Sequence, residues 1–306
     1  MLNPFFSVVI PSYNQGKYLK KALDSVFKQT YNNFEVILID NNSTDNTKKI
    51  IKAFKKKIIY KKIKNLGVIA KSRNKGISIS RGKWVAFLDS DDYWEKNKLK
   101  NIYKKIKKNN FDVICHDEWI VNTEGKKNNL WTYGPYEKNF YKKLLIYGNR
   151  NSTSASVVKK NFLKHHKIEF NESKSLVTAE DYDFFLKIAQ KKGVFYYLNK
   201  PLGFHLMHDL SYSSKKDLHL KSIKNVIKKH VYKVQKFDSS KKLLEKKILD
   251  IIKIRNLFVK FKNINLDKKS IKSLITFIVY KPILIILTLK MLFLKFLRTF
   301  FTLIFK

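Results

Sequence analysis

The first third of the chain alternates runs typical of buried β-strands with stretches in which apolar residues recur at helical spacing. The strand-like runs are Phe6–Ile10, Glu35–Ile39, a weaker one at Ile58–Tyr60, and Trp84–Leu88. Helical spacing fills the intervals, within residues 19–27, 50–54 and 70–79. Such alternation predicts an α/β fold with a mostly parallel central sheet, joined by right-handed crossovers and flanked by helices. Ligands of these sheets bind beyond the carboxyl ends of the strands.

Composition indicates a folded and strongly basic protein. Hydrophobic residues make up 44% of the 306, which is enough to bury a core and excludes a disordered chain. Lysine and arginine number 64 against 24 acidic residues, and the net charge of +40 predicts attraction to nucleic acid, anionic lipid or phosphorylated ligands. The single cysteine, Cys115, precludes an intramolecular disulfide, and the polar Pro11–Asn14 arrives too early for a signal-peptide core. We therefore expect a cytoplasmic protein.

The rest of the chain divides by composition into three parts. Residues 111–204 mix strand and helix patterns, residues 215–262 are helical in pattern and heavily basic, and residues 270–306 are rich in Leu, Ile and Phe. We expect a main domain with two halves, a basic helical extension and a terminal segment, over residues 1–213 (1–115 and 116–213), 214–269 and 270–306.

Polar residues follow three of the predicted strands. They form the clusters Pro11–Asn14, Asp40–Asp45 and Asp89–Asp92, which should meet along one edge of the sheet. The carboxylates of an Asp-x-Asp turn can face one hard divalent cation, since Mg²⁺ and Mn²⁺ bind one or two carboxylates together with diphosphate oxygens. Alternatively, these acids are solvated loop residues or cap a helix after Tyr93. Aspartates so close together repel each other unless a cation is bound, which favours the metal site.

A resemblance to a known family rests on two runs of the sequence, FSVVIPSYNQGKYLKKALDSVFKQTYNNFEVILIDNNSTDNT and NLGVIAKSRNKGISISRGKWVAFLDSDDYW. They resemble the nucleotide-binding half of family 2 glycosyltransferases, which have the GT-A fold. The resemblance is close over residues 5–115 and thins out by residue 213. It implies a Rossmann-like GT-A sheet, a nucleotide-diphosphate sugar donor with UDP favoured, and Mg²⁺ or Mn²⁺ as cofactor. The halves 1–115 and 116–213 would then bind the nucleotide sugar and the acceptor.

The resemblance also implies roles for single residues. Those implied to hold the base and ribose of the donor are Pro11, Ser12, Tyr13, Asp40 and Asn41. Arg73 would approach the donor, Asp89 would bind near the ribose, and Asp91 would ligate the metal. Many members carry two acids where this chain has Asp40-Asn41, which leaves the base contact open. Taken alone, Arg73 on a basic helix is typical of a solvated residue, and residues 41–44 are typical of a turn with a helix cap.

A second acidic cluster, Ala179–Asp183, opens a predicted helix with the apolar face Phe184, Phe185, Ile188 and Ala189. The helix macrodipole favours acids in a first turn, and this alone would explain them. The resemblance implies instead that Asp181 is the general base, which deprotonates the acceptor hydroxyl as that hydroxyl attacks the anomeric carbon. Attack opposite the leaving group gives a single displacement with inversion.

The stretch Phe204–Ser213 resembles a family segment with an aromatic-Arg pair, a His and two spaced serines. His208, Ser211 and Ser213 fit this segment, whereas Leu206 stands where Arg is common. His208 would reach the metal or a phosphate, or it is an ordinary hydrogen-bonded histidine. The sequence has no Gln-x-x-Arg-Trp motif of processive synthases, which favours transfer of one sugar per acceptor.

Residues 270–306 contain no uninterrupted apolar run of the roughly eighteen residues that a spanning helix needs. On a helical wheel most of their basic and hydroxyl side chains fall within one arc, and Lys290 lies opposite. This pattern predicts an in-plane amphipathic segment that binds anionic lipid at the inner face of the plasma membrane. The alternative is a core helix packed on the domain or on a second copy of the chain.

The expected function is transfer of a sugar from a nucleotide-diphosphate donor to a glycan or lipid-linked acceptor of lipopolysaccharide, capsule or a related surface polymer. Two other classes stay open: a basic nucleic-acid-binding protein using Lys215–Lys262, and a non-catalytic scaffold of a glycan-assembly complex. The basic run carries no zinc-finger or RNA-recognition signature, so no nucleic-acid partner is expected. Acids at both Asp91 and Asp181 argue against the scaffold.

Overall fold

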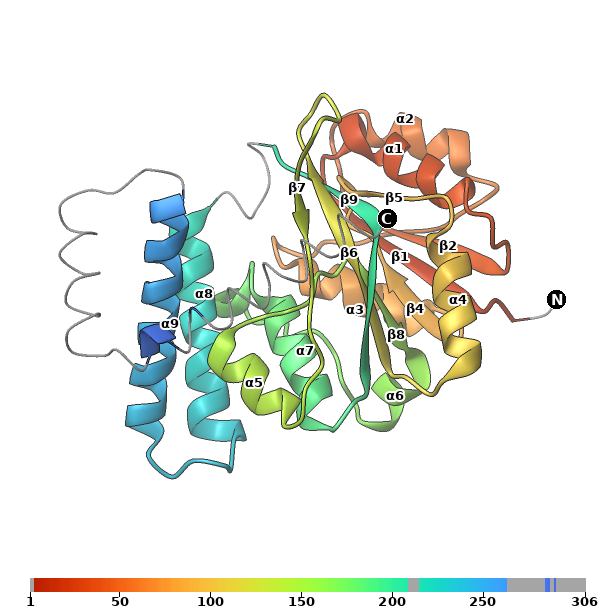
Figure 1. Ribbon diagram of the computed structural model, residues 1–306. Coiled ribbons are helices and arrows are strands. Elements are labelled where there is room, and N and C mark those ends of the chain that lie inside the picture. Colours follow the sequence, from red (N-terminus) through yellow and green to blue (C-terminus); the bar gives the residue numbers. More distant parts are fainter. Residues whose placement is uncertain (1–2, 209–214, 263–283, 287–288, 290–306) are drawn as a thin grey trace.

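The computed structural model describes residues 3–208, 215–262, 284–286 and 289 (Figure 1). Its strands are β1 (Phe6–Ser12), β2 (Phe34–Asp40), β3 (Ile59–Lys62), β4 (Trp84–Phe87), β5 (Tyr93–Trp94), β6 (Val113–Val121), β7 (Lys127–Trp131), β8 (Ser156–Lys159) and β9 (Phe195–Leu206). Its helices are α1 (Gly16–Phe27), α2 (Thr47–Phe54), α3 (Ile69–Ile79), α4 (Lys98–Lys108), α5 (Phe140–Tyr147), α6 (Lys160–His165), η1 (Lys174–Leu176), α7 (Glu180–Gln190), α8 (Lys216–Lys229), η3 (His230–Val234) and α9 (Lys241–Lys262). The predicted amphipathic segment 270–306, apart from 284–286 and 289, lies outside the described residues, as do Ser211 and Ser213.

The strands form one sheet in the order β3-β2-β1-β4-β8-β6-β9-β5, and β7 pairs with the edge of β6. The four N-terminal strands are parallel to one another, as the alternating sequence predicted. Beyond them the sheet is mixed, because β8 runs antiparallel to both β4 and β6, while β6 and β9 are parallel. The carboxyl ends of β2, β1 and β4 therefore lie side by side, and the three polar clusters meet at one edge.

Alternate residues of the central strands point to opposite faces of the sheet, and both faces are buried. Val9 and Phe87 pack on one face with residues of α3, α5 and α7, and Val8 and Ala86 pack on the other with α1 and α4. A strand buried on both sides needs apolar residues at nearly every position, which explains the continuous runs in the sequence.

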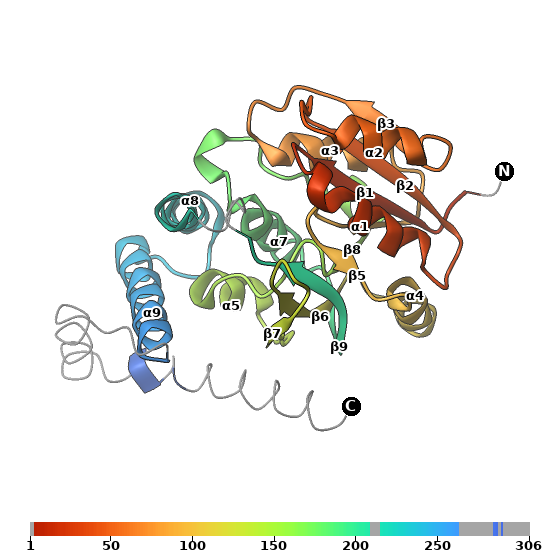
Figure 2. The same cartoon turned by 90° about the horizontal axis from the view of Figure 1, so that it is seen from above.

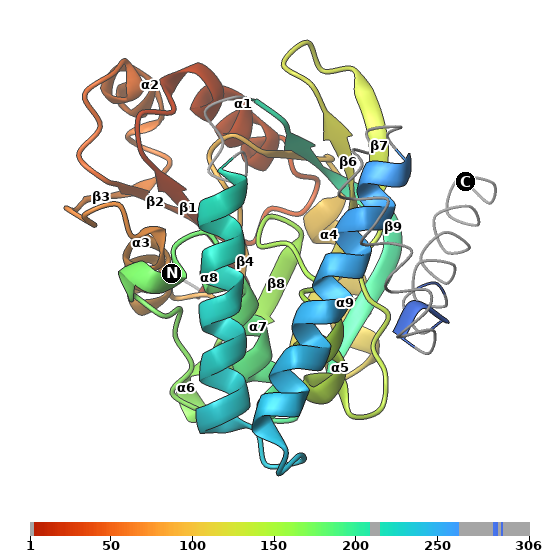
Figure 3. The same cartoon turned by 90° about the vertical axis from the view of Figure 1, so that its left-hand side faces the viewer.

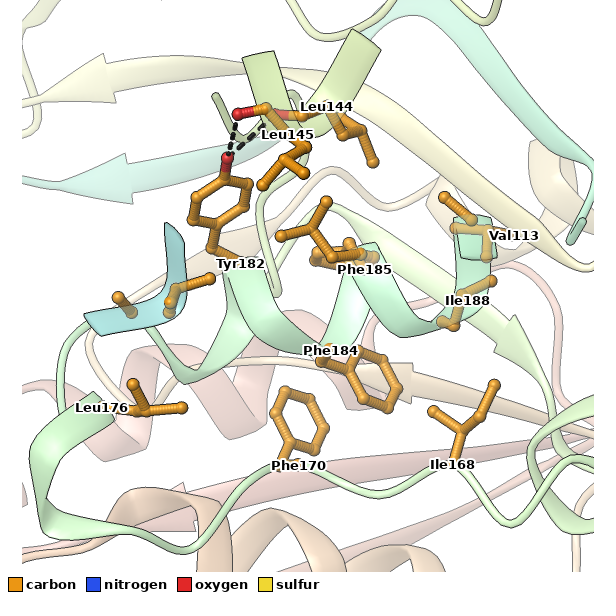
Figure 4. Packing of buried hydrophobic residues seen from close by; sticks show 14 of the residues in the cluster. Val113, Leu144, Leu145, Ile168, Phe170, Leu176, Tyr182, Phe184, Phe185 and Ile188 are labelled. Atoms are coloured by element: carbon orange, nitrogen blue, oxygen red, sulfur yellow. Dashed lines mark hydrogen bonds between the residues drawn. The ribbon is translucent and has the colours of Figure 1, made fainter. Parts of the chain in front are cut away.

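Helix α7 lies deep in the core (Figure 4). The Phe184 ring stacks on Phe170, with centroids 3.9 Å apart and planes at 5°, and both rings are buried. The Tyr182 hydroxyl donates to the carbonyl oxygens of Leu144 and Leu145 at 2.9 and 3.2 Å. Burying one such ring stabilises the fold by about 1.5–3 kcal/mol, so the N-terminus of α7 has a rigid support.

Helices α8 and α9 confirm the helical pattern predicted over 215–262, and they lie side by side (Figure 3). Figure 2 shows them on the side of α5 and α7 that is away from β1, β2 and β3. Their buried side chains join the apolar cluster that contains α5 and α7, through Val226, Ile227, Val231, Leu244, Ile248 and Ile251. In the part of the chain that the structure describes, no helix combines the length and apolarity that crossing a bilayer requires.

Candidate active site

The end of β2 is organised by Asp40, which pairs in register with Ser12 of β1. The Asp40 carboxylate is fully buried and accepts hydrogen bonds from the Ser43 hydroxyl at 2.5 Å and the Tyr60 hydroxyl at 3.0 Å. These bonds fix the turn that carries Asn41, and they hold Asp40 below the surface. A direct contact between Asp40 and a donor stays a prediction.

The neighbouring polar groups are more accessible to a ligand. Tyr13 is 52% exposed just beyond β1, where Pro11 and Ser12 are buried. The Asn41 side-chain oxygen accepts from the Asn65 backbone N–H at 2.7 Å, so its amide nitrogen is the group left to contact a base. The Asn41 amide nitrogen donates a hydrogen bond, whereas the carboxylate that many family members have at this position would accept one. Residues 41–44 have no regular secondary structure, and α2 begins only at Thr47.

Arg73 of α3 joins the loop that follows β4 to the first turn of α7. Its guanidinium lies 2.7 Å from Asp89, which follows β4, and 2.7 Å from Glu180, the first residue of α7. Arg73 is only 3% exposed, so the interpretation of this residue as a solvated one is wrong. A buried guanidinium is tolerated where carboxylates compensate its charge, and Arg73 therefore holds these two acids together.

The aspartates of the 89–92 loop each have their own partner. Asp89 pairs with Arg73, while Asp92 is buried and accepts from the Leu206 backbone N–H at 3.0 Å and pairs with His205. These partners reduce the mutual repulsion of the aspartates without a metal, so repulsion alone does not require a cation in this loop. The alternative of a helix cap is wrong, because β5 occupies Tyr93–Trp94 and α4 begins only at Lys98.

Asp91 and His208 are brought together from positions 117 residues apart. The His208 Nε2 lies 3.0 Å from Asp91 Oδ2. Adjacent ligands of an octahedral ion with bonds of about 2.1 Å are about 3 Å apart, so the pair fits two positions of a Mg²⁺ or Mn²⁺ shell. Among the described residues no cluster of three or more His, Cys, Asp or Glu is placed to hold a metal. Two protein ligands suit an ion that takes its remaining ligands from a diphosphate.

Asp181, in the first turn of α7, has the environment of a general base. Its Oδ2 accepts from the Asn149 side chain at 2.9 Å, and its Oδ1 accepts from the Tyr182 backbone N–H at 2.7 Å. Burial and the neighbouring Glu180 raise the pKa of Asp181 to about 7, against the opposing effect of Arg73. A carboxylate with a pKa near neutrality takes a proton more readily than an ordinary aspartate. The predicted apolar face of the helix, Phe184, Phe185, Ile188 and Ala189, is buried as expected.

The segment before α7 is held by the helical extension. Thr178 has a left-handed backbone with φ of 79°, a costly conformation for a β-branched residue. In α8, the His219 Nδ1 lies 2.9 Å from the Thr178 carbonyl oxygen, and the Ser222 hydroxyl donates to the Val177 carbonyl at 2.6 Å. Strain of this kind persists only where its surroundings enforce it, so α8 positions the turn from which Asp181 projects.

One partner of the candidate site, Asn149, was not predicted from the sequence. Asn149, which binds Asp181, follows α5 in a loop without a motif, and nothing in the local sequence signals it. Asp183 belongs to the predicted acidic cluster, but it is buried away from Asp181, where Lys229 and His230 lie 2.6 and 3.0 Å from its Oδ1. Asp181 and Asp183 of α7 thus have different partners, Asn149 in the candidate site and residues of the helical extension.

Comparison with known proteins gives a consistent family. The model of the family described as Glycosyl transferase family 2 matches residues 7–166, just over half of the chain. Glycosyltransferase GlyG of Streptococcus pneumoniae serotype 4 is 32% identical over 145 residues, covering 46% of this chain and 44% of GlyG. Poly(ribitol-phosphate) beta-N-acetylglucosaminyltransferase TarS of Staphylococcus aureus strain MW2 is 31% identical over 214 residues, covering 66% of this chain and 36% of TarS. The chain thus spans less than half the length of these two relatives.

Solved structures share the fold. Residues 1–349 of S. aureus TarS in complex with UDP-GlcNAc align with a TM-score of 0.62 and 25% identity, covering 80% of this chain and 71% of that one. The mannosyltransferase PcManGT of Pyrobaculum calidifontis, in complex with GDP-Man and Mn²⁺, aligns with a TM-score of 0.54 and 15% identity, covering 100% of this chain and 89% of that one. This fold agrees with the expected GT-A sheet, and by the match of its sequence to the family model the chain belongs to glycosyl transferase family 2.

Proposed function

We propose that this protein is a metal-dependent, inverting glycosyltransferase that moves a sugar from a UDP-sugar to a glycan or lipid-linked acceptor of a cell-surface polymer. The single observation that carries the proposal is the double ion pair of Arg73 with Asp89 and Glu180, both at 2.7 Å. Through it, the acid beyond β4 and the acids of α7 share one site. A donor bound at the first and a hydroxyl bound at the second would be neighbours.

The donor is proposed to bind along the ends of β1, β2 and β4, on Tyr13, Asn41 and Asp89. TarS, which resembles this chain in sequence and fold, has been solved with UDP-GlcNAc and supports the choice of a UDP-sugar. Asp91 and His208 would hold Mg²⁺ or Mn²⁺, and that ion would neutralise the charge of the leaving diphosphate. The 3.0 Å between Asp91 Oδ2 and His208 Nε2 supports this assignment.

The chemistry assigned to the chain itself is proton removal and orientation. Asp181 would take the proton of the acceptor hydroxyl, and the Asn149 bond at 2.9 Å would keep its carboxylate oriented. Arg73 would hold Glu180 and Asp89 in place without contacting the hydroxyl. Attack from the side opposite the leaving group inverts the anomeric centre in a single displacement.

A thermal-stabilisation screen tests the proposal directly. UDP-GlcNAc, UDP-glucose, UDP-galactose and GDP-mannose are each added to the full chain with Mn²⁺, with Mg²⁺ and with EDTA. A ligand that binds only the native state raises the unfolding temperature. At least one UDP-sugar should therefore raise it, and most of this increase should disappear in EDTA. A chain that responds to no nucleotide sugar under any of these conditions contradicts the proposal.

We further propose that residues 270–306 attach the enzyme to the inner face of the plasma membrane. The supporting observations are the amphipathic arc of that sequence and the net charge of +40. The full chain should co-sediment with vesicles that contain phosphatidylglycerol far better than with neutral vesicles. Salt should weaken this binding only in part, because it screens the charges but leaves the apolar contacts. If a chain truncated after residue 269 binds both kinds of vesicle as the full chain does, membrane binding belongs to another part of the protein.

A further inference from the structure

An exposed tryptophan stands next to the candidate active site. Trp131 ends β7 and is 41% exposed, whereas Trp84 and Trp94 are 5% and 4% exposed. Its indole stacks on the His205 imidazole, with ring centroids 5.3 Å apart and planes at 23°. The imidazole thus lies against one face of the indole, and part of the side chain stays exposed. A single exposed ring is common on protein surfaces, so its surroundings decide whether it has a role.

The support beneath this ring is fixed. The His205 Nδ1 lies 3.2 and 3.3 Å from the two carboxylate oxygens of Asp92. Asp92, itself 2% exposed, also accepts from the Leu206 backbone N–H at 3.0 Å. Burial by itself would lower the pKa of His205, but Asp92 raises this pKa to about 10. The imidazole therefore keeps one orientation and holds the indole in place. A ring held in this way loses little conformational freedom when a ligand packs on it.

The strand order gives the position of Trp131 relative to the donor. The proposed nucleotide contacts follow β1 and β2, Asp89 and Asp91 follow β4, and β7 pairs with the same edge of β6 as β8, beyond the end of β8. The line of β7 is thus about one strand spacing, roughly 5 Å, from β4, on the side away from β1 and β2. Trp131 therefore lies across the acidic loop from the base contacts, on the side toward which a transferred sugar and its acceptor would extend.

The segment after Trp131 leads to the proposed base. The Gly134 backbone N–H donates to the Arg150 carbonyl at 3.2 Å, and the adjacent Asn149 binds Asp181. At its other end, Trp131 contacts His205, and His205 contacts Asp92, the neighbour of Asp91. The run from Trp131 to Gly134 thus connects the surroundings of the proposed metal ligand with those of the proposed base.

We propose that the open face of Trp131 binds a pyranose ring of the acceptor, an inference that rests on the proposed function. The C–H groups on one face of a pyranose carry partial positive charge and pack against the negative face of an aromatic ring. The hydroxyls around the rim of the sugar stay free for polar contacts, and one of them can approach Asp181. Stacking of this kind selects for a sugar ring over a flexible chain of similar polarity.

Saturation-transfer NMR tests the inference. It is performed on the full chain with UDP, in a buffer that contains Mg²⁺ and no Mn²⁺. The probes are the methyl glycosides of glucose, galactose, N-acetylglucosamine and rhamnose. At least one should bind and receive saturation mainly on one face of its ring. Trp131→Ala and Trp131→Leu should each weaken that binding roughly tenfold, the order lost with one aromatic anchor. Trp131→Phe keeps a ring face and should retain most of the affinity.

Tyr232→Ala is the matched control, because Tyr232 is 40% exposed on η3 and lies outside the proposed site. It should bind the glycosides as the wild type does. UDP affinity, measured by calorimetry, should be unchanged in all four variants. Failure of the wild type to bind UDP or any UDP-sugar contradicts the proposed function. If UDP binding is normal, two outcomes overturn this inference and leave the proposed function standing. Either no glycoside binds, or Trp131→Ala and Trp131→Leu bind glycosides as the wild type does.

Discussion

Replacing Asp181 with asparagine is expected to lower the transfer rate by about 10²- to 10⁴-fold, the range lost with a general base. The change removes the group that takes the proton and keeps the shape of the side chain. Donor contacts are proposed on β1, β2 and β4, so the affinity for UDP-sugar and for metal should stay near that of the wild type. Single-turnover transfer and calorimetry, performed on the same preparation, separate these two effects.

The pH profile gives an independent reading of the same group. A general base works in its deprotonated form, and burial with the nearby Glu180 raises the pKa of Asp181 to about 7. The transfer rate of the wild type should therefore rise about tenfold per pH unit below pH 7 and level off above it. Asp181→Asn should lose this dependence. A residual rate with an unchanged profile would assign the proton transfer to another group.

Asp183→Asn, two residues further along α7, is the contrasting control. Asp183 is buried, and Lys187, Lys229 and His230 hold the pKa of its carboxyl well below the usual value despite the cost of burial. Its substitution should lower the unfolding temperature, because it removes the buried charge that pairs with Lys187 and Lys229 and weakens the contact with the buried His230. The rate per folded molecule should change far less than in Asp181→Asn. Equal losses of rate in both variants would mean that the helix, and not the base, is what the changes disturb.

Replacing Asp91 with asparagine is expected to abolish the metal-dependent part of UDP binding. The neutral amide is a poor ligand for Mg²⁺ or Mn²⁺, and it leaves His208 as the single protein ligand of the proposed pair. The fold should be little affected, since the Asp91 side chain is 21% exposed and belongs to a loop. Calorimetry with UDP and Mn²⁺, compared with EDTA, measures the metal-dependent difference directly.

His208→Ala should lower metal-dependent UDP binding in the same direction, and Asp24→Asn is the matched control. Asp24 is a partly exposed acid of α1, paired with Lys20 at 2.7 Å and outside the proposed site. It should bind UDP and Mn²⁺ as the wild type does. Unchanged metal-dependent binding in Asp91→Asn would exclude Asp91 as a ligand, whatever its effect on the transfer rate.

Local sequence was enough to predict the elements that carry the site. The buried strands, the helical basic extension and the helix opened by the 179–183 acids are present where their apolar periodicity indicated. Periodicity succeeds here because a doubly buried strand or an amphipathic helix requires its pattern within a few consecutive residues. The meeting of the three polar clusters also followed, because the carboxyl ends of adjacent parallel strands share one edge.

Pairings between distant residues could not be predicted in this way. Arg73 meets Glu180 across 107 residues, where α3 and α7 share one apolar cluster. Asp91 meets His208 across 117 residues, next to the antiparallel pairing of β5 with β9. The sequence predicted that the 89–92 acids repel one another as a group, whereas in the structure each has a separate partner. It also treated 214–269 as an extension, whereas α8 holds the strained Thr178 just before Asp181.

The sequence by itself therefore determined the family of the chain, the strands of its parallel half and the residue types at their carboxyl ends, since each of these is a short-range property. Only the tertiary structure decided which acids are buried, which are paired and which keep an unusual proton affinity. The pKa of Asp181 depends on its burial, on Glu180 and on Arg73, and these act on one carboxylate only after the sheet has formed and α7 has packed against it.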